Sequence, residues 1–231
     1  KKPSPPEQML VRNNWTDSSE RMTIITPLTM FYKIRDEKNG KLLHAAFYPG
    51  SMSSAYMPNN AVSHQHDHFE LMYVLEGELT NKIERISYTY KKGDACLLNR
   101  NTRHMDIPGP RCSVVFINFH AEYILDLMDR DVLFDLSPRL TSPDGIIHDF
   151  LLSNLQGEER FARNYLEFSS TLHTLSSPSE NPAEVLIDRM QQSLIDNRPG
   201  YSSLLRGLLL RLIYTLEDKN KFHCNFMQLD S

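Results

Sequence analysis

Hydrophobic periodicity changes once along this chain, near residue 120. Between Met30 and Phe119 the apolar residues form short segments, such as HAAFYPG, FELMYVLEG and SVVFINF, with Gly, Pro, Asn and Asp between them. Short strands separated by turn residues are typical of an all-β barrel or sandwich. After Phe119 the apolar residues recur at helical spacing. The sequence therefore predicts a mainly β plus α chain, with an N-terminal arm over 1–29, a β-barrel over 30–120 and a helical region over 121–231.

Several helices are expected in the C-terminal region. Apolar spacing predicts helices near residues 124–128 and 146–151. A further helix is predicted from the spacing of Phe161, Tyr165, Phe168 and Leu172. The next helix has Asn181 as a candidate N-cap and Pro182 at the first helical position.

The last predicted helix, residues 201–217, carries a broad apolar stripe. The stripe includes Leu205, Leu208, Leu209, Leu212 and Leu216. A helix with apolar residues at this spacing packs equally well against its own chain or against another copy. Both alternatives are open, and we expect the stripe to contribute to a homodimer as well as to the core.

Charge and cysteine content exclude several classes of protein. The 231 residues include 25 Lys+Arg and 29 Asp+Glu, whereas nucleic-acid surfaces usually carry a basic excess. The three cysteines form no CxxC pair, which argues against a disulfide framework or a zinc ribbon and favours a reducing compartment. The longest apolar run, residues 208–213, is interrupted by Arg211 and is far shorter than the ~20 residues of a membrane span. We expect a cytoplasmic protein without a membrane partner.

Alternating histidines mark the candidate site. The stretch HQHDHFELMYVLEG begins at His64, and residues two apart on a strand share one face of the sheet. By this parity, a ligand-binding pocket is lined by His64, His66, Glu70 and Met72, and a later histidine, His104, follows a Gly-Asp turn. His68 has the same parity, but we expect a turn there to direct it to solvent or into a loop.

This set of side chains allows two kinds of site. His64, His66, Glu70 and His104 are the ligand types that hold Zn, Fe, Mn or Ni, with coordination positions left open. The alternative is a metal-free pocket in which the same groups form hydrogen bonds to one another and to a ligand.

Two motifs resemble those of the cupin superfamily. HQHDHFELMYVLEG is similar to the pattern H-x-H-x3-E-x6-G, and GDACLLNRNTRHMDIP is similar to the second cupin motif, with His104 at its histidine position. The departures from the two motifs are Pro58, Asn99, Asn101 and Pro108. The resemblance implies a jelly-roll β-barrel.

Within that superfamily, residues 40–220 resemble the N-terminal domain of AraC-type transcription regulators. The likeness includes HQHDHFELMYVLEGELT, YTYKKGDACLLNRNTRH and CSVVFINFHAEYILDL, followed by helices. It implies a barrel that binds a small effector, such as a sugar or related metabolite, and helices that support a homodimer. It also implies that DNA is bound by a C-terminal pair of helix-turn-helix motifs, which this chain lacks and which we expect beyond Ser231.

Two other functions stay open. One is a stand-alone metal-dependent cupin enzyme, an oxygenase, isomerase or decarboxylase, with the same four ligands. Against it stand the helical region after the barrel and the absence of an obvious base or nucleophile beside the histidines. The other is a dimerisation platform whose pocket is vestigial. We predict an effector-binding regulator without catalysis.

Overall fold

The computed structural model describes residues 10–13, 20–24, 28–35, 40–57, 61–134, 145–156, 164–171 and 181–229. The two strands before residue 28 and the last five residues of the first helix are described by their backbone alone. The strands are β1 (Leu10–Asn13), β2 (Glu20–Ile24), β3 (Leu28–Arg35), β4 (Leu42–Tyr48), β5 (Ser51–Met57), β6 (His64–His66), β7 (Phe69–Ile83), β8 (Ile86–Lys91), β9 (Ala95–Leu98), β10 (His104–Phe119), β11 (Asn164–Ser170) and β12 (Phe222–Gln228). The helices are α1 (Glu122–Phe134), α2 (Ile146–Gln156), α3 (Pro182–Asp196) and α4 (Tyr201–Leu216).

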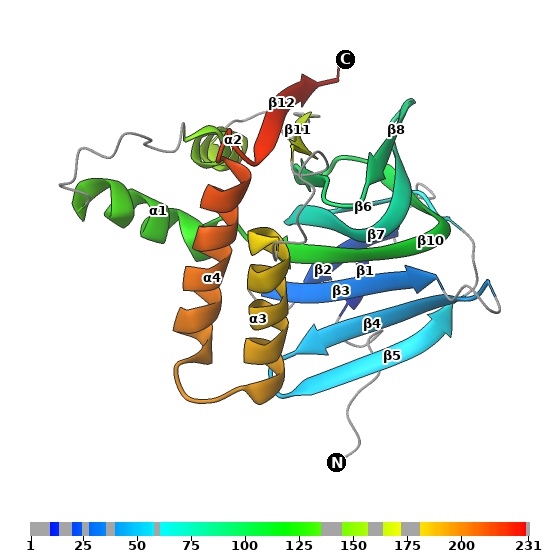
Figure 1. Ribbon diagram of the computed structural model, residues 1–231, viewed down its shortest axis with the longest axis horizontal. Coiled ribbons are helices and arrows are strands. Elements are labelled where there is room, and N and C mark those ends of the chain that lie inside the picture. The colour runs from blue at the N-terminus through cyan, green and yellow to red at the C-terminus, as the bar shows by residue number, and fades with distance from the viewer. Residues whose placement is uncertain are drawn as a thin grey trace.

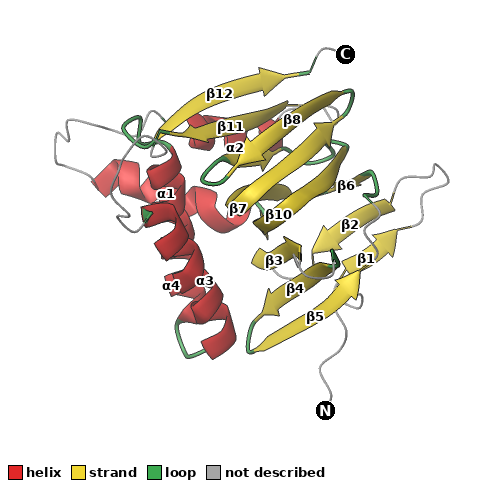
Figure 2. Ribbon diagram, turned by 45° about the vertical axis from the view of Figure 1, so that its right-hand side comes forward, coloured by secondary structure: helices red, strands yellow, loops and turns green. Residues whose placement is uncertain are grey.

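The two longest strands, β7 and β10, form the centre of the β-structure. They pair antiparallel, and the C-terminal half of β10 also pairs with β3. From β3 the sheet continues through β4 to β5, and from β7 it continues through β9 and β11 to β12. Figure 1 shows α1, α3 and α4 on one side of the strands and α2 beside β11 and β12, and Figure 2 shows the same division between helices and strands. This is the mainly β plus α class predicted from the sequence.

Alternation along β7 separates two buried clusters. Met72 and Val74 belong to an apolar cluster in the barrel interior, whose other members come from strands β7 to β11. Leu71 and Tyr73 point to the opposite face and join a second cluster that includes the buried faces of α1 to α4. Successive residues of a strand point to opposite faces, so one strand serves both clusters.

One predicted helix is wrong. Residues 164–170 form the strand β11, which pairs antiparallel with both β9 and β12. Tyr165 lies in the interior cluster, whereas Leu166 and Phe168 lie in the cluster that packs against the helices. Because both faces of this strand are buried, its apolar residues show no simple alternation, and periodicity alone cannot distinguish such a strand from a helix. Phe161 and Leu172 lie outside the described residues.

Strands also occur on both sides of the expected barrel boundaries. β1 and β2, within the expected arm, pair with each other, and β2 pairs in parallel with β6. At the other end of the chain, β12 follows the last helix. The sheet is therefore assembled from segments that are far apart in the sequence.

The leucine stripe of α4 packs inside the chain. All five predicted stripe residues are buried, and they pack in the cluster formed with α1, α3 and the outer face of the barrel, namely Leu205, Leu208, Leu209, Leu212 and Leu216. The intramolecular alternative therefore describes these side chains within one copy of the chain. Among the helices that the structure describes, none has the length and apolar character needed to cross a bilayer.

Candidate functional site

Two strands bring the predicted histidines together. His64 and His66 lie on β6, and His104 opens β10, where it pairs in register with His64. The ring centroids are 4.2 Å apart for His64 and His104 and 5.1 Å apart for His66 and His104. Each of the three histidines offers a ring nitrogen within 4.8 Å of the others, an arrangement that could hold a metal ion. The convergence expected from strand parity is present.

Glu70 on β7 lies between two of these histidines. Its carboxylate oxygens are 3.4 Å from Nε2 of His66 and 3.3 Å from Nε2 of His104. These separations suit charge attraction, but the contacts do not have hydrogen-bond geometry, because both nitrogens and one carboxylate oxygen are buried without a hydrogen bond among the described residues. Met72, two residues further along β7, is fully buried in the apolar part of the interior.

Backbone carbonyls fix the orientation of each histidine ring. Nδ1 of His64 lies 3.0 Å from the carbonyl oxygen of Val62. Nδ1 of His66 lies 2.9 Å from the carbonyl oxygen of His68, and Nδ1 of His104 lies 3.0 Å from that of Thr102. A carbonyl oxygen only accepts hydrogen bonds, so Nδ1 carries the proton and Nε2 of a neutral ring is left with a lone pair. This use of the second ring nitrogen is typical of histidines that bind metals.

Several hydrogen-bond acceptors therefore face one another in the interior. When these rings carry one proton each, the Nε2 lone pairs of His66 and His104 face the oxygens of Glu70, with no donor between them among the described residues. Such a cluster is stable only if it takes up a proton or a cation, since unpaired buried polar groups are costly. The donor set thus fits a divalent metal, with His64, His66, Glu70 and His104 as its ligands.

The pKa shifts follow the same distribution of charge. Burial, together with repulsion from His104, lowers the pKa of His64 to about 3. Burial alone would raise the pKa of Glu70, but the adjacent His66 and His104 outweigh it and hold that pKa well below its usual value. For His104, burial acts to lower the pKa, and the contact with Glu70 reverses the effect and raises it. The contact between Glu70 and His104 therefore favours the charged form of each group.

The expectation for His68 is wrong. Its side chain is fully buried and its ring stacks on that of His66, with centroids 4.1 Å apart and an interplanar angle of 13°. Burial lowers the pKa of His68 to about 4, with a further contribution from His66. The bend between β6 and β7 turns the ring inward rather than outward, so His68 supports the orientation of His66.

Sequence reasoning missed a second polar group in the same interior. Lys33 on β3 donates a 2.5 Å bond to Oδ2 of Asp106 on β10, and the side chain of Asp106 is only 1% exposed. Burial would raise the pKa of Asp106, but Lys33 outweighs it and lowers that pKa. Next to Lys33, on β4, burial lowers the pKa of His44 to about 4, and Lys33 adds to this shift. Asp106 is two residues after His104, so strand parity could have pointed to it.

Further polar side chains line the same interior. Glu70, Asn118 and Thr29 stand in register across β7, β10 and β3. Oγ1 of Thr29, Oδ1 of Asn118 and Oδ1 of Asp106 are buried without a hydrogen-bond partner among the described residues. The interior is therefore apolar around Met72 and polar on either side of it, as binding sites for small molecules commonly are.

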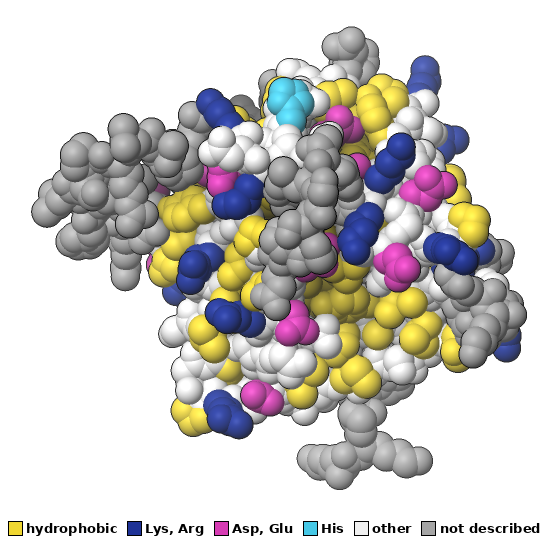
Figure 3. Space-filling model, in the orientation of Figure 1, with side chains coloured by type: hydrophobic (Ala, Val, Ile, Leu, Met, Phe, Trp, Pro, Cys, Tyr) yellow, Lys and Arg dark blue, Asp and Glu magenta, His cyan; other side chains and the backbone are white. Residues whose placement is uncertain are grey.

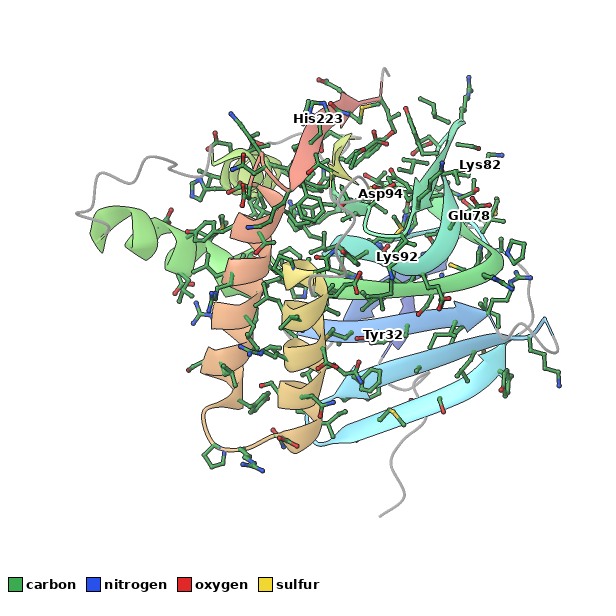
Figure 4. The ribbon with its side chains drawn as sticks, in the orientation of Figure 1. Tyr32, Glu78, Lys82, Lys92, Asp94 and His223 are labelled. Carbon is green, nitrogen blue, oxygen red and sulfur yellow. The ribbon has the colours of Figure 1, made fainter. Side chains whose placement is uncertain are left out.

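A separate hollow lies outside the barrel. It is lined by Gly77, Glu78, Lys91, Lys92, Pro110 and Arg111. In Figure 4, Glu78, Lys82 and Lys92 lie around β7 and β8, at the surface. None of the predicted site residues lines this hollow, so we place the candidate site in the barrel interior.

Comparison with known proteins identifies the family. The family model of the AraC-like ligand binding domain matches residues 53–213, well over half of the chain. The chain belongs to this family. The match includes the histidine cluster, Asp106 and the helix α3, as the sequence resemblance predicted. Thr29, Lys33 and His44, which border the same interior, precede the matched range.

Solved structures similar to this AraC-like domain share little sequence with it. The AraC-like transcriptional activator CuxR is 11% identical, with a TM-score of 0.38 over 87% of this chain and 64% of CuxR. A cupin-2 domain containing protein from Shewanella frigidimarina is 19% identical, with a TM-score of 0.25 over 37% of this chain and 76% of that protein. KdgF from a Halomonas species is 18% identical, with a TM-score of 0.25 over 46% and 86% of the two chains. A search of curated proteins finds no match.

Proposed function

We propose that this chain is the effector-sensing domain of an AraC-type transcription regulator, and that it binds a small molecule inside the barrel without catalysis. The observation that carries the proposal is a set of buried polar atoms that have no hydrogen-bond partner among the described residues, on Glu70, Asp106, Asn118 and Thr29. Polar groups in a protein interior are normally paired. A polar ligand between the strands would supply the missing bonds, and it would shift the protein toward whichever state binds it more tightly.

The free atoms favour a ligand rich in hydroxyl groups. The free oxygens of Glu70 and Asp106 accept hydrogen bonds, whereas the ammonium group of Lys33, held beside Asp106, donates them. A hydroxyl group donates and accepts at once, so it matches a carboxylate placed next to an ammonium. A sugar or a related polyhydroxylated metabolite is therefore the effector class that we propose.

The histidine cluster would also allow the site to bind a metal ion. His64, His66, Glu70 and His104 would hold a divalent metal such as Zn, Fe, Mn or Ni. A bound ion would balance the charge of Glu70 and bind an effector oxygen as a Lewis acid. The same ligand set favours the alternative function, a metal-dependent cupin enzyme. Bound metal together with turnover of a diol or keto substrate would support that alternative.

In the full-length regulator, DNA would be bound by a separate C-terminal domain rather than by this one, and the protein would act in the cytoplasm. The net charge of −4 suits this division, because the sensing domain has no basic excess. Helix α3 packs on β4 and β5 and on α4, so the two helices would carry a change in the barrel toward the DNA-binding part.

A thermal-shift screen tests the proposed function. Sugars, sugar acids and polyols would be screened against the protein, once after dialysis with EDTA and once with added Zn, Fe, Mn or Ni. A ligand at a hundred times its dissociation constant should add about 2.7 kcal/mol to the free energy of unfolding. We expect at least one polyhydroxylated compound to raise the melting temperature of the wild type and of the surface control Glu78→Gln, but not of Asp106→Asn. If no compound stabilises the wild type in either metal state, the interior is not a sensing pocket.

A further inference from the structure

Strand β5 forms an open edge of the sheet. Among the described strands it pairs with β4 alone, in an unbroken antiparallel register from Leu42↔Met57 to Tyr48↔Ser51. Its outward side chains are well exposed, with 53% of Met52 and 56% of Tyr56 accessible to solvent. Hydrophobic side chains gather on the same part of the molecule in Figure 3, over the β3 to β5 region. Among the described strands, none pairs with the other side of β5.

The composition of β5 is unusual for an open edge. Edge strands usually carry charged residues, proline or a bulge, which prevent pairing with another chain. The sequence of β5, SMSSAYM, contains no charged residue and no proline, and its pairing with β4 has no register shift. Its free side therefore presents seven residues of regular backbone to another strand.

The spacing of the apolar residues selects a second copy of this chain as the partner. If two β5 strands pair antiparallel over their full length, Ser54 lies at the twofold axis. Tyr56 of each copy then stands directly opposite Met52 of the partner subunit, on the outer face of the sheet. Directly opposed aromatic and apolar side chains stabilise antiparallel strands by about 0.2–1 kcal/mol per pair. Two such pairs form by symmetry, as in any isologous interface.

Another edge strand, β12, does not have this self-complementarity. β12 also lacks charged residues, and Phe226 on it is 55% exposed. Full-length antiparallel pairing of two β12 strands would centre on Asn225 and place Phe226 opposite Cys224, a side chain that is partly buried in its own chain. The apolar stripe of α4 is likewise buried in its own chain, as described above.

We propose that two copies of this chain pair through β5, in an antiparallel register centred on Ser54, so that one sheet continues through both subunits. The inner face of β5 borders the polar part of the interior, because Ser53 and Ala55 pair with Ala46 and His44 of β4. The turn before β5 is bonded to α3, since the N–H of Gly50 donates a 2.8 Å hydrogen bond to the carbonyl of Leu194. The interface therefore lies next to the effector pocket and next to the helices.

Cysteine cross-linking tests this register directly. In Ser54→Cys the two thiols would face each other across the axis, at a separation suited to a disulfide. The control is Leu204→Cys, an equally exposed apolar position on α4. Under mild oxidation we expect Ser54→Cys to form a covalent dimer at least tenfold faster than Leu204→Cys. The wild type, which contains only the native cysteines, measures the background rate. Equal rates in the two variants, or no covalent dimer in Ser54→Cys, would overturn the proposal.

A second measurement avoids new cysteines. The molar mass of the wild type, Tyr56→Lys and Leu204→Lys would be determined by light scattering over a hundredfold range of concentration. We expect the dimer dissociation constant to rise at least tenfold in Tyr56→Lys and to stay unchanged in Leu204→Lys, with both melting temperatures as in the wild type. A monomeric wild type, or a dimer that only Leu204→Lys dissociates, would show that β5 is not the interface.

Discussion

The side-chain amide of Asn181 donates a 2.8 Å hydrogen bond to the hydroxyl group of Tyr73. Asn181 is also the N-cap of α3, where its Oδ1 accepts the N–H of Ala183 at 3.0 Å. Tyr73 adjoins Met72 on β7, so the start of α3 is attached to the strand that carries Glu70. Together with the bond from Gly50 to Leu194, this contact fixes α3 to the barrel at both ends.

Removing the tyrosine hydroxyl should weaken this attachment. Tyr73→Phe keeps the ring but loses the bond to Asn181, which should lower the free energy of unfolding by about 0.5–1.5 kcal/mol. Effector affinity should change little, whereas the response of the full-length regulator to effector should fall. Urea unfolding and a reporter assay measure the two effects, with Tyr201→Phe as the control. An unchanged response in Tyr73→Phe would mean that α3 does not transmit occupancy through this bond.

Gly77 is predicted to be irreplaceable for steric reasons. Its φ of +68° lies in the left-handed region, and a Cβ atom there would be 1.2 Å from the carbonyl oxygen of Arg111. The matched control is Gly40, with a φ of +66° and no atom within 4 Å of the added Cβ. We expect Gly40→Ala to cost about 1–2 kcal/mol and Gly77→Ala considerably more. Equal free energies of unfolding for the two variants would contradict the close approach of β7 and β10.

We predict that the contact between α1 and α2 makes the free energy of unfolding depend on pH. Nε2 of His148 on α2 lies 2.8 Å from Asp129 on α1, and Nδ1 lies 3.4 Å from Asp149. Partial burial acts to lower the pKa of His148, but the bonds to the two carboxylates outweigh it and raise that pKa above its usual value of 6.5. The folded state therefore binds this proton more tightly than the unfolded state, which stabilises the fold fully below pH 6.5. The stabilisation is lost as the pH rises through the raised pKa.

Comparison with His148→Gln isolates this contribution, because the other titrating groups are common to both proteins. The wild type should be more stable than the variant at pH 5.5, and the difference should shrink at pH 8.5. Urea unfolding at the two pH values measures it. A difference that grows with pH would mean that the pKa of His148 is not raised.

The sequence predicted the parts of the site that depend on local geometry. Alternation on a strand placed His64, His66 and Glu70 together, and the second motif added His104. The pairing of Lys33 with Asp106 could not be predicted in the same way, because 73 residues separate them and their contact depends on the pairing of β3 with β10. Parity indicates which face a residue occupies, but it does not indicate which strands become neighbours.

The same limit explains why the packing of the leucine stripe and the strand β11 could not be predicted from the sequence. The stripe on α4 was correctly placed on one face, but its periodicity could not show that the barrel and α3 would cover it. For β11, the neighbours β9 and β12 bury both of its faces, so the sequence contains no alternation from which a strand could be predicted. In each case tertiary packing, rather than local propensity, determined the outcome.

Isothermal titration of the stabilising compound from the screen tests the central claim, that the barrel interior binds an effector through its free polar groups. The wild type and Glu78→Gln should bind one molecule per chain with equal affinity. Asp106→Asn, which replaces the buried carboxylate beside Lys33 with an amide of the same shape, should bind at least tenfold more weakly. Equal affinity in all three proteins would contradict the account, because it would place the compound outside the interior.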